Sequence, residues 1–190
     1  MPPRGERWIH EVKHDGYRLI ARRVGDRVVL RTRGGYNWAE RYPRILRSVL
    51  SLRVGSIVLD GEAAVLDPHG VSDFDALHSR TRDDWAILLA FDLLELDGQD
   101  LREVPLIERK RRLKRQLLSR HDDGLQYVEH LEGDGSTMFE RACRMGLEGI
   151  VCKRADSIYR AGPSKAWLKV KNREHPAMTR VAKAFDRHGR

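Results

Sequence analysis

The stretch HEVKHDGYR, residues 10–18, places several charges in a segment that otherwise reads as extended. Lys13 stands two residues before an aspartate and a glycine, with Glu11 upstream and Arg18 downstream. Alternation along a strand over 11–24 would put the lysine and the aspartate on one face. A charge inside a sheet costs free energy unless it is paired or meets a ligand. The stretch therefore indicates either a binding face or, more simply, a solvated cluster of charges.

Short runs of strand-forming residues, separated by turn residues, predict most of the other elements. Gly25 and Asp26 predict a hairpin between the strand over 11–24 and a strand over 27–33. Further strands are predicted over residues 56–67, 86–98, 125–131, 149–154 and 167–173, helices over 37–50, 105–118 and 137–145, and a loop over 119–124. This irregular order of strands and helices indicates an α+β fold.

The helix predicted over 105–118 carries both an apolar stripe and a strong positive charge. Leu106, Leu113 and Leu117 form the stripe that should face the core. Six Lys and Arg residues between positions 109 and 115 crowd the remaining surface, which predicts a solvated basic face rather than a dedicated nucleic-acid helix. For the helix over 137–145, Thr137 and Glu140 predict a capping box, and Gly146 should end the helix.

Composition restricts the class of partner. The chain of 190 residues has 36 Lys and Arg against 28 Asp and Glu, a net charge of +8, which favours phosphate-rich partners. Nucleic acid is the leading candidate, with a ribosomal or anionic-lipid role as the alternative. The longest apolar run, residues 85–91, is too short to cross a bilayer, so we expect a cytoplasmic protein without a membrane partner. Two cysteines and no paired-ligand histidine motif predict no zinc site.

Eight charged residues lie within the predicted strands or at their ends. Because each would be costly there alone, we expect them to line one polar groove over the sheet. They are Lys13, Asp15, Arg33, Glu62, Glu148, Lys153, Lys169 and Lys171. A lysine whose neutral amine faces a cation-lined groove is equipped to attack phosphorus, and the glycine after Asp15 would let the backbone approach a ligand closely.

The motif EVKHDGYR resembles the nucleotidyl-accepting lysine motif of ATP-dependent DNA ligases and of their relatives, the RNA ligases and mRNA capping enzymes. The motifs that follow resemble those of the family in the same order: RTRGG at 31–35, LDGE at 59–62, AFDLLELDG at 90–98, LEGIVCKR at 147–154 and WLKVK at 167–171. The resemblance covers about residues 4–175. It is greatest to the adenylation domains of bacterial end-joining ligases, which share sequences like GVSDFDALHSR and YVEHLEGDG.

The resemblance implies an ATP-grasp-like nucleotidyltransferase domain, in which two antiparallel sheets flanked by helices surround a nucleotide groove. It places this domain over residues 1–175 and leaves 176–190 as a basic C-terminal tail, either a short helix or frayed. Complete DNA ligases of the family carry an OB-fold domain after the last motif, and we expect none in this chain.

The resemblance also implies a role for each site residue. Lys13 would attack the α-phosphate of ATP and carry AMP. Glu11 would read the adenine amino group, with Phe91 and Val151 on either side of the base. Arg18 and Glu62 would hold the ribose. Phosphate contacts would come from Lys153, Lys169 and Lys171, with Arg33 meeting either the nucleotide phosphate or the 5′-phosphate of a nick. Glu148 would help bind Mg²⁺ or Mn²⁺.

The expected function is that of an ATP-dependent DNA ligase catalytic domain, acting on nicked or broken double-stranded DNA. A separate OB-fold or repair protein is a further candidate partner. Two alternatives stay open: an RNA ligase or capping-type nucleotidyltransferase, and a non-catalytic module that binds AMP or nucleic acid. The non-catalytic module differs from the enzymes in that it would form no covalent adduct on Lys13.

Overall fold

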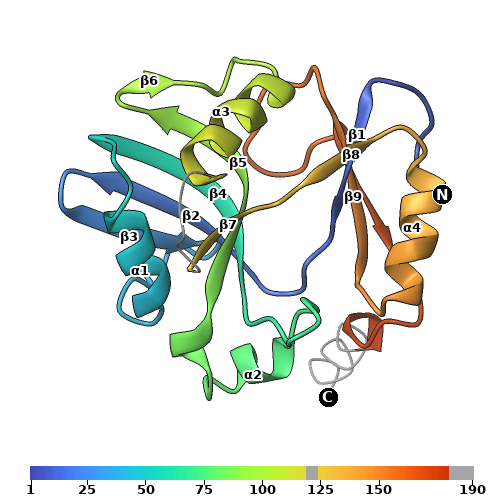
Figure 1. The fold of residues 1–190 in the computed structure, drawn as a ribbon, viewed down its shortest axis with the longest axis horizontal. Coiled ribbons are helices and arrows are strands. Elements are labelled where there is room, and N and C mark those ends of the chain that lie inside the picture. Colours follow the sequence, from blue (N-terminus) through green and yellow to red (C-terminus); the bar gives the residue numbers. More distant parts are fainter. Residues whose placement is uncertain (119–123, 180–190) are drawn as a thin grey trace, which may run out of the picture.

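Two sheets built from widely separated parts of the chain face one another in the computed structural model, which describes residues 1–118 and 124–179 (Figure 1). The strands are β1 (Trp8–Val12), β2 (Tyr17–Val24), β3 (Arg27–Thr32), β4 (Ser56–Ala64), β5 (Ile87–Leu96), β6 (Gln99–Asp100), β7 (Leu125–Tyr127), β8 (His130–Glu132), β9 (Gly149–Arg154) and β10 (Trp167–Lys171). The helices are α1 (Pro43–Leu50), α2 (Phe74–His78), α3 (Leu106–Leu118), α4 (Gly135–Arg144) and the short 3₁₀ helix η1 (Asp83–Trp85).

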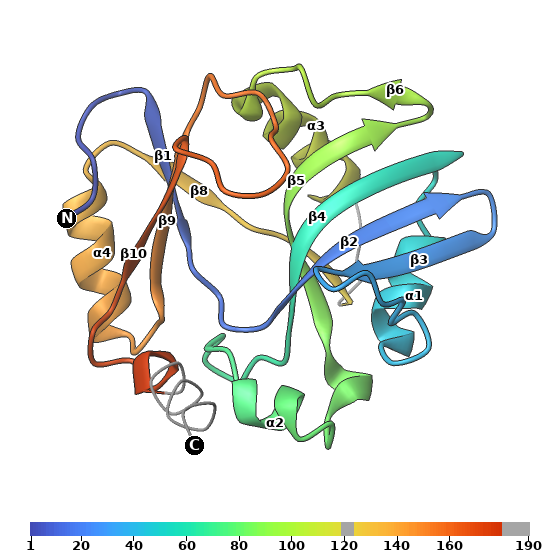
Figure 2. The same cartoon turned by 180° about the vertical axis from the view of Figure 1, so that it is seen from behind.

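Sheet A has the strand order β10-β9-β1-β8 and is antiparallel throughout. Sheet B has the order β3-β2-β4-β5-β6, also antiparallel, with β7 pairing in parallel with β5. The chain starts in sheet A with β1, builds all of sheet B, and returns to sheet A for β8, β9 and β10 (Figure 2). The predicted α+β class and the pair of sheets are thus confirmed, and among the described strands only the β5–β7 pair departs from antiparallel order.

The prediction of one continuous strand over 11–24 is wrong. Residues 13–16 leave the end of β1 and cross to the start of β2, so residues 11–12 belong to sheet A and residues 17–24 to sheet B. The backbone N–H of Lys13 donates to the carbonyl of Gly149 at 2.9 Å, and that of Asp15 to the Ser72 hydroxyl at 3.3 Å. These bonds replace the strand ladder, so strand alternation does not apply to Lys13 and Asp15, which lie in the crossing from one sheet to the other.

The strand predicted over 125–131 divides in the same way. β7 lies in sheet B and β8 in sheet A, and the N–H of Val128 donates to the carbonyl of Ala90 at 2.9 Å at the crossing. By contrast, the hairpin predicted at Gly25 is confirmed, because β2 and β3 pair in antiparallel register from Leu19 opposite Thr32 to Val24 opposite Arg27.

The helix predicted over 37–50 is shorter than expected and begins at Pro43, whose missing N–H suits a first turn. Residues before it bind the edge of β3 instead: the Asn37 side chain accepts from the N–H of Leu30 at 3.0 Å, and the N–H of Trp38 donates to the Leu30 carbonyl at 2.8 Å. α1 then packs Ile45 and its neighbours into the core of sheet B, while α4 covers sheet A (Figure 1).

Helix α3 corrects the prediction of a wholly solvated basic face. Leu106, Leu113 and Leu117 are buried as expected, but Arg109 and Lys110 are 0% exposed. Arg109 makes two bonds to the buried Asp92 of β5, at 2.7 and 2.8 Å. A buried guanidinium is stable only with such a partner. The rest of the basic face, including the exposed Arg111 and Arg115, is as predicted.

Helix α4 starts earlier than the capping-box prediction placed it. Asp134 is the N-cap, and its side chain accepts from the N–H of Ser136 at 3.0 Å and from the Thr137 hydroxyl at 2.8 Å. Thr137 is therefore inside the first turn. The expected end at Gly146 is confirmed, because that residue has φ +70°.

Two predictions fall largely outside the described residues, namely the loop over 119–124 and the tail over 176–190. Within the described ranges, the longest helices fall short of the length and apolar character needed to cross a membrane.

Gly16→Ala tests the crossing between the sheets. A Cβ at this position would lie 2.1 Å from the carbonyl oxygen of Ala63 on β4. Because backbone cannot yield cheaply, we expect the free energy of unfolding to fall by about 1–3 kcal/mol or more, as measured by urea denaturation. Gly55→Ala is the matched control, since its Cβ would meet only the Asp97 carboxylate at 3.4 Å. Equal stability of the two variants would contradict this account.

Candidate active site

Lys13 lies at the crossing between the sheets and donates through Nζ to the Glu148 carboxylate. Glu148 is 5% exposed and directly precedes β9. Gly149 allows this approach: it has φ +138°, and a Cβ there would lie 2.1 Å from the carbonyl oxygen of Val170 on β10. A glycine at that position therefore lets two strands and the carboxylate come together beside the lysine.

Two lysines of β10, Lys169 and Lys171, lie on the same side of the site as Glu148. Lys171 Nζ lies 3.9 Å from Glu148 Oε1, and Lys169 pairs in register with Val151 of β9. Burial lowers the pKa of Lys169, and the charge of Lys13 lowers it further. On the facing sheet, burial raises the pKa of Glu62 to about 7, although the charges of Lys13 and Arg18 oppose the rise.

Arg18 is fixed by a carboxylate that the sequence prediction did not include. Its guanidinium makes two bonds to Asp60 of β4, at 3.0 and 2.6 Å, and these bonds raise the pKa of Arg18. The Tyr159 hydroxyl, from the loop before β10, donates to Asp60 at 2.9 Å. The guanidinium also lies 5.7 Å from the ring centres of Phe91 and Trp167. Arg18 therefore contacts residues of both sheets.

The two rings belong to opposite sheets and enclose a buried lysine. Phe91 of β5 and Trp167 of β10 meet edge to face with centroids 5.8 Å apart. Lys153 Nζ lies 4.2 Å from the Phe91 centroid, 4.1 Å from that of Trp167, and 2.6 Å from Glu11 Oε2. Burial alone would raise the pKa of Glu11, but Lys110 and Lys153 more than offset it, so this pKa is lowered. Burial lowers the pKa of Lys153.

The structure brings together nearly all the residues predicted for the site. One group, which we name the lysine cluster, surrounds Glu148. The lysine cluster consists of Lys13, Arg18, Glu62, Glu148, Lys169 and Lys171. A second group, the aromatic cluster, adjoins it through Arg18. The aromatic cluster consists of Glu11, Phe91, Val151, Lys153 and Trp167.

Arg33 is the exception among the predicted residues. It is exposed in the turn after β3, at the edge of sheet B, where Thr32 pairs with Leu19. That register places it at the same end of the sheet as Glu62, which pairs with Arg18. Arg33 therefore lies at the rim of the site and belongs to neither cluster.

Sequence reasoning missed Asp60, Tyr159, His14 and Lys110. Lys110 was assigned to a solvated face, yet its spacing of four from Leu106 and three from Leu113 puts it on the core stripe, a signal that was available. His14 follows Lys13 directly, and burial lowers the pKa of its imidazole to about 4, so the ring is neutral near pH 7. Nothing in the local sequence of Tyr159 indicates its contact with Asp60.

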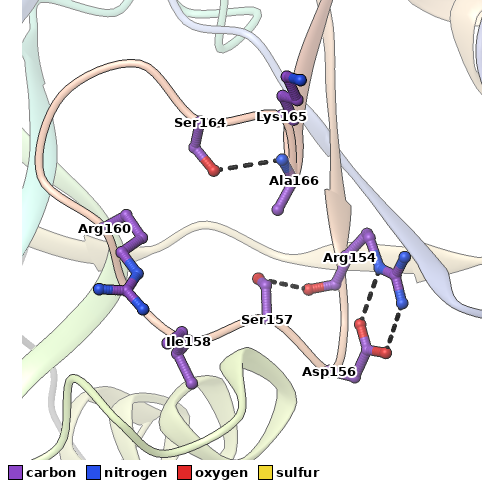
Figure 3. Close-up of a pocket in the computed structure, with 8 residues that line it drawn as sticks. All are labelled: Arg154, Asp156, Ser157, Ile158, Arg160, Ser164, Lys165 and Ala166. Carbon is purple, nitrogen blue, oxygen red and sulfur yellow. Dashed lines mark hydrogen bonds and ion pairs between the residues drawn. The ribbon is translucent and has the colours of Figure 1, made fainter.

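A cavity of about 490 Å³ lies outside both clusters, in the segment that joins β9 to β10 (Figure 3). Its lining comes from this segment and from the end of β9, and it includes Arg154, Arg160 and Lys165. Arg154 is occupied by two bonds to Asp156, at 3.0 and 2.6 Å. The cavity contains none of the predicted site residues.

Comparison with known proteins now decides the family. Residues 3–171 match the family model described as the ATP dependent DNA ligase domain, and this range contains both clusters. The chain belongs to this family.

The ligase domain is 41% identical over 174 residues to the multifunctional non-homologous end joining protein LigD of Pseudomonas aeruginosa, covering 90% of this chain and 21% of that relative. It is 33% identical over 179 residues to the SPbeta prophage-derived DNA ligase-like protein LigB of Bacillus subtilis, covering 92% of this chain and 64% of that relative. The chain thus spans about a fifth of the length of the LigD proteins.

Among solved structures, the ligase domain of Mycobacterium tuberculosis LigD superposes with a TM-score of 0.75 at 34% identity, covering 90% of this chain and 59% of that one. A mycobacterial DNA ligase D complexed with ATP and MES gives a TM-score of 0.74 at 34% identity, with coverages of 90% and 58%. The resemblance to end-joining ligases and the ligase-domain fold predicted from the sequence are both confirmed.

Glu62→Gln tests the electrostatics of the lysine cluster. The pKa of Glu62 is raised from 4.5 to about 7 in the folded chain, so between these pH values the folded state holds a proton that the unfolded state has released. The free energy of unfolding of the unmodified chain should therefore fall, relative to the variant, by about 1–3 kcal/mol as the pH rises through this window. Urea denaturation at several pH values measures this difference, and a pH-independent difference would exclude the raised pKa.

Proposed function

We propose that the ligase domain transfers AMP from ATP to the Nζ of Lys13 and then to the 5′-phosphate of nicked or broken double-stranded DNA. One observation carries this proposal: Lys13 lies between the sheets beside Glu148, with Lys169, Lys171 and Arg18 around it. A transferring phosphoryl group needs positioning and neutralisation of its charge more than further covalent chemistry. The lysine cluster supplies both, together with a nucleophile.

In the first step the neutral amine of Lys13 attacks the α-phosphorus. A P–N bond forms, the bond from that phosphorus to the bridging β-phosphate oxygen breaks, pyrophosphate leaves, and the amine releases a proton to solvent. In the second step a 5′-phosphate oxygen of DNA attacks the same phosphorus. The P–N bond breaks, a phosphoanhydride forms, and Lys13 takes up a proton again. The adjoining 3′-hydroxyl then attacks the phosphorus of the 5′-phosphate: a phosphodiester bond forms, the phosphoanhydride bond to AMP breaks, AMP leaves, and the hydroxyl proton passes to solvent.

The aromatic cluster supports binding of the base. Phe91 and Val151, which we name the stacking pair, come from opposite sheets, and Glu11 pairs in register with Val151. Arg18 and Glu62 are assigned to the ribose. Lys169 and Lys171 are assigned to the α-phosphate, whereas Lys153 reaches a phosphate only by leaving Glu11 and the two rings that now surround it.

A divalent cation fits the donors of the lysine cluster. Glu148 offers hard carboxylate oxygens, and its charge contributes to the raised pKa of Glu62 on the facing sheet. Mg²⁺ favours one or two carboxylates together with substrate phosphates. Glu148 would hold Mg²⁺ or Mn²⁺ there, and the ion would neutralise charge that develops on the phosphates.

Intact mass spectrometry after incubation with ATP and Mg²⁺ tests the first step. We expect a gain of one adenylyl group that Lys13→Ala abolishes, because no other amine replaces the nucleophile. Lys165→Ala, which removes an exposed lysine from the segment between β9 and β10, is the matched control and should gain the adenylyl group normally. Absence of the adduct in the unmodified chain would favour a non-catalytic binding module, and charging by GTP in preference to ATP would favour a capping-type enzyme.

Arg33→Ala separates the second step from the first. Because Arg33 lies at the rim and outside both clusters, the variant should form lysyl-AMP normally but transfer AMP to nicked DNA several-fold more slowly. The slope of log binding constant against log salt concentration should also fall by about one, the value for one lost phosphate contact. Arg53→Ala, at the opposite end of sheet B, is the control. Single-turnover transfer from pre-charged protein provides the measurement. Impaired charging of Arg33→Ala would assign this residue to the nucleotide instead.

A further inference from the structure

Lys110 occupies a core position on helix α3. It lies four residues after Leu106 and three before Leu113, so it belongs to the apolar stripe of the helix, and like both leucines it is 0% exposed. A fully buried lysine costs free energy that an apolar side chain of similar length would not. Packing of α3 on sheet B therefore gives no reason for a lysine at this position.

Every donor of the Lys110 ammonium group has an acceptor within reach. Nζ donates to Glu11 Oε1 at 2.5 Å, to the Val128 carbonyl at 3.0 Å and to the Phe91 carbonyl at 3.4 Å. It also lies 4.6 Å from the ring centre of Tyr127. The three acceptors come from β1, from the crossing between β7 and β8, and from β5. Such a set of contacts fixes the ammonium in one place.

Lys153 contacts the other oxygen of the same carboxylate but is held differently. Its Nζ lies 2.6 Å from Glu11 Oε2, and its remaining close neighbours are the rings of Phe91 and Trp167. The carbonyl oxygens give Lys110 directional hydrogen bonds beside its ion pair, whereas the rings give Lys153 less directional cation–π contacts. Of the two lysines, Lys110 is therefore the permanent partner of Glu11, and Lys153 the one that a nucleotide can displace.

A carboxylate paired in this way has a defined recognition chemistry. Two cations keep Glu11 ionised, and an ionised carboxylate only accepts hydrogen bonds. Once Lys153 moves, Oε2 would face the base held by the stacking pair, because Glu11 pairs in register with Val151. Such an acceptor favours an amino group on the base and opposes a carbonyl oxygen.

We propose that Lys110 is a positioning residue for base recognition: it fixes the Glu11 carboxylate as an acceptor, so that the site selects purines with an amino group at position 6. This inference rests on the proposed nucleotide site. Lys110 itself touches neither the base nor the reacting phosphate, and it acts through Glu11 alone.

Calorimetric titration of AMP and of purine riboside monophosphate, which lacks the 6-amino group, tests this role in Lys110→Met. The methionine keeps the length and packing of the lysine stem without its charge. We expect the unmodified chain to prefer AMP and the variant to lose about tenfold of that preference, the loss typical of a hydrogen bond to a charged group. Lys110→Arg, which retains the charge, should lose less. Lys114→Met, on the exposed side of the same helix, should keep the full preference.

A purely structural role for Lys110 would weaken the binding of both nucleotides equally and would overturn the inference, as would equal binding by the unmodified chain. The measured quantity is the ratio of the affinities for AMP and for purine riboside monophosphate, both titrated into the same protein preparation. A partly unfolded variant therefore still gives a valid ratio, and Lys110→Arg supplies it if Lys110→Met does not fold. Preferential AMP binding without any covalent adduct would overturn the proposed catalytic function while leaving the role of Lys110 intact.

Discussion

Helix α3 joins the two sheets through two neighbouring buried cations. Arg109 binds Asp92 in sheet B, and the next residue, Lys110, reaches Glu11 in sheet A. A buried carboxylate keeps its charge only beside a cation, and a buried cation is stable only beside a carboxylate. This mutual requirement fixes how the sheets face one another. Because the lysine cluster and the aromatic cluster draw residues from both sheets, their geometry depends on it.

The sequence predicted the elements of the fold better than the places where the chain changes sheets. Alternation and turn residues identified nearly every strand, since a pleated face leaves a period of two in the sequence. They failed over 11–24 and 125–131, where two short strands in different sheets read as one long strand. A crossing of a few residues is too short to interrupt the period-two pattern of apolar residues from which strands are predicted. Gly16 marks the first crossing, but its close contact with Ala63 is visible only in three dimensions.

The site residues were predicted from family motifs, and the structure brings all of them but Arg33 into two adjoining clusters. The motifs could not identify the residues that hold the others in place. Asp60 belongs to the motif LDGE at 59–62, yet nothing in that motif indicates its two bonds to Arg18. Lys110 was hidden among six basic residues, where composition predicts solvation and only the helical register indicates burial. Support of this kind comes from tertiary contacts, which a single sequence records weakly.

The order in which the strands leave the ribosome differs from the order in which they can pair. β1 is made first, but its partners β8 and β9 follow only after all of sheet B, and Lys13 and Glu148 are 135 positions apart. The strands of sheet B can pair with one another before the partners of β1 have been synthesised. Until then, the nascent chain carries β1, with the apolar Ile9, as an unpaired strand. Contacts of such long range slow folding and prolong the exposure of strand edges. Lys13 therefore reaches Glu148 only through strands that are synthesised after the whole of sheet B.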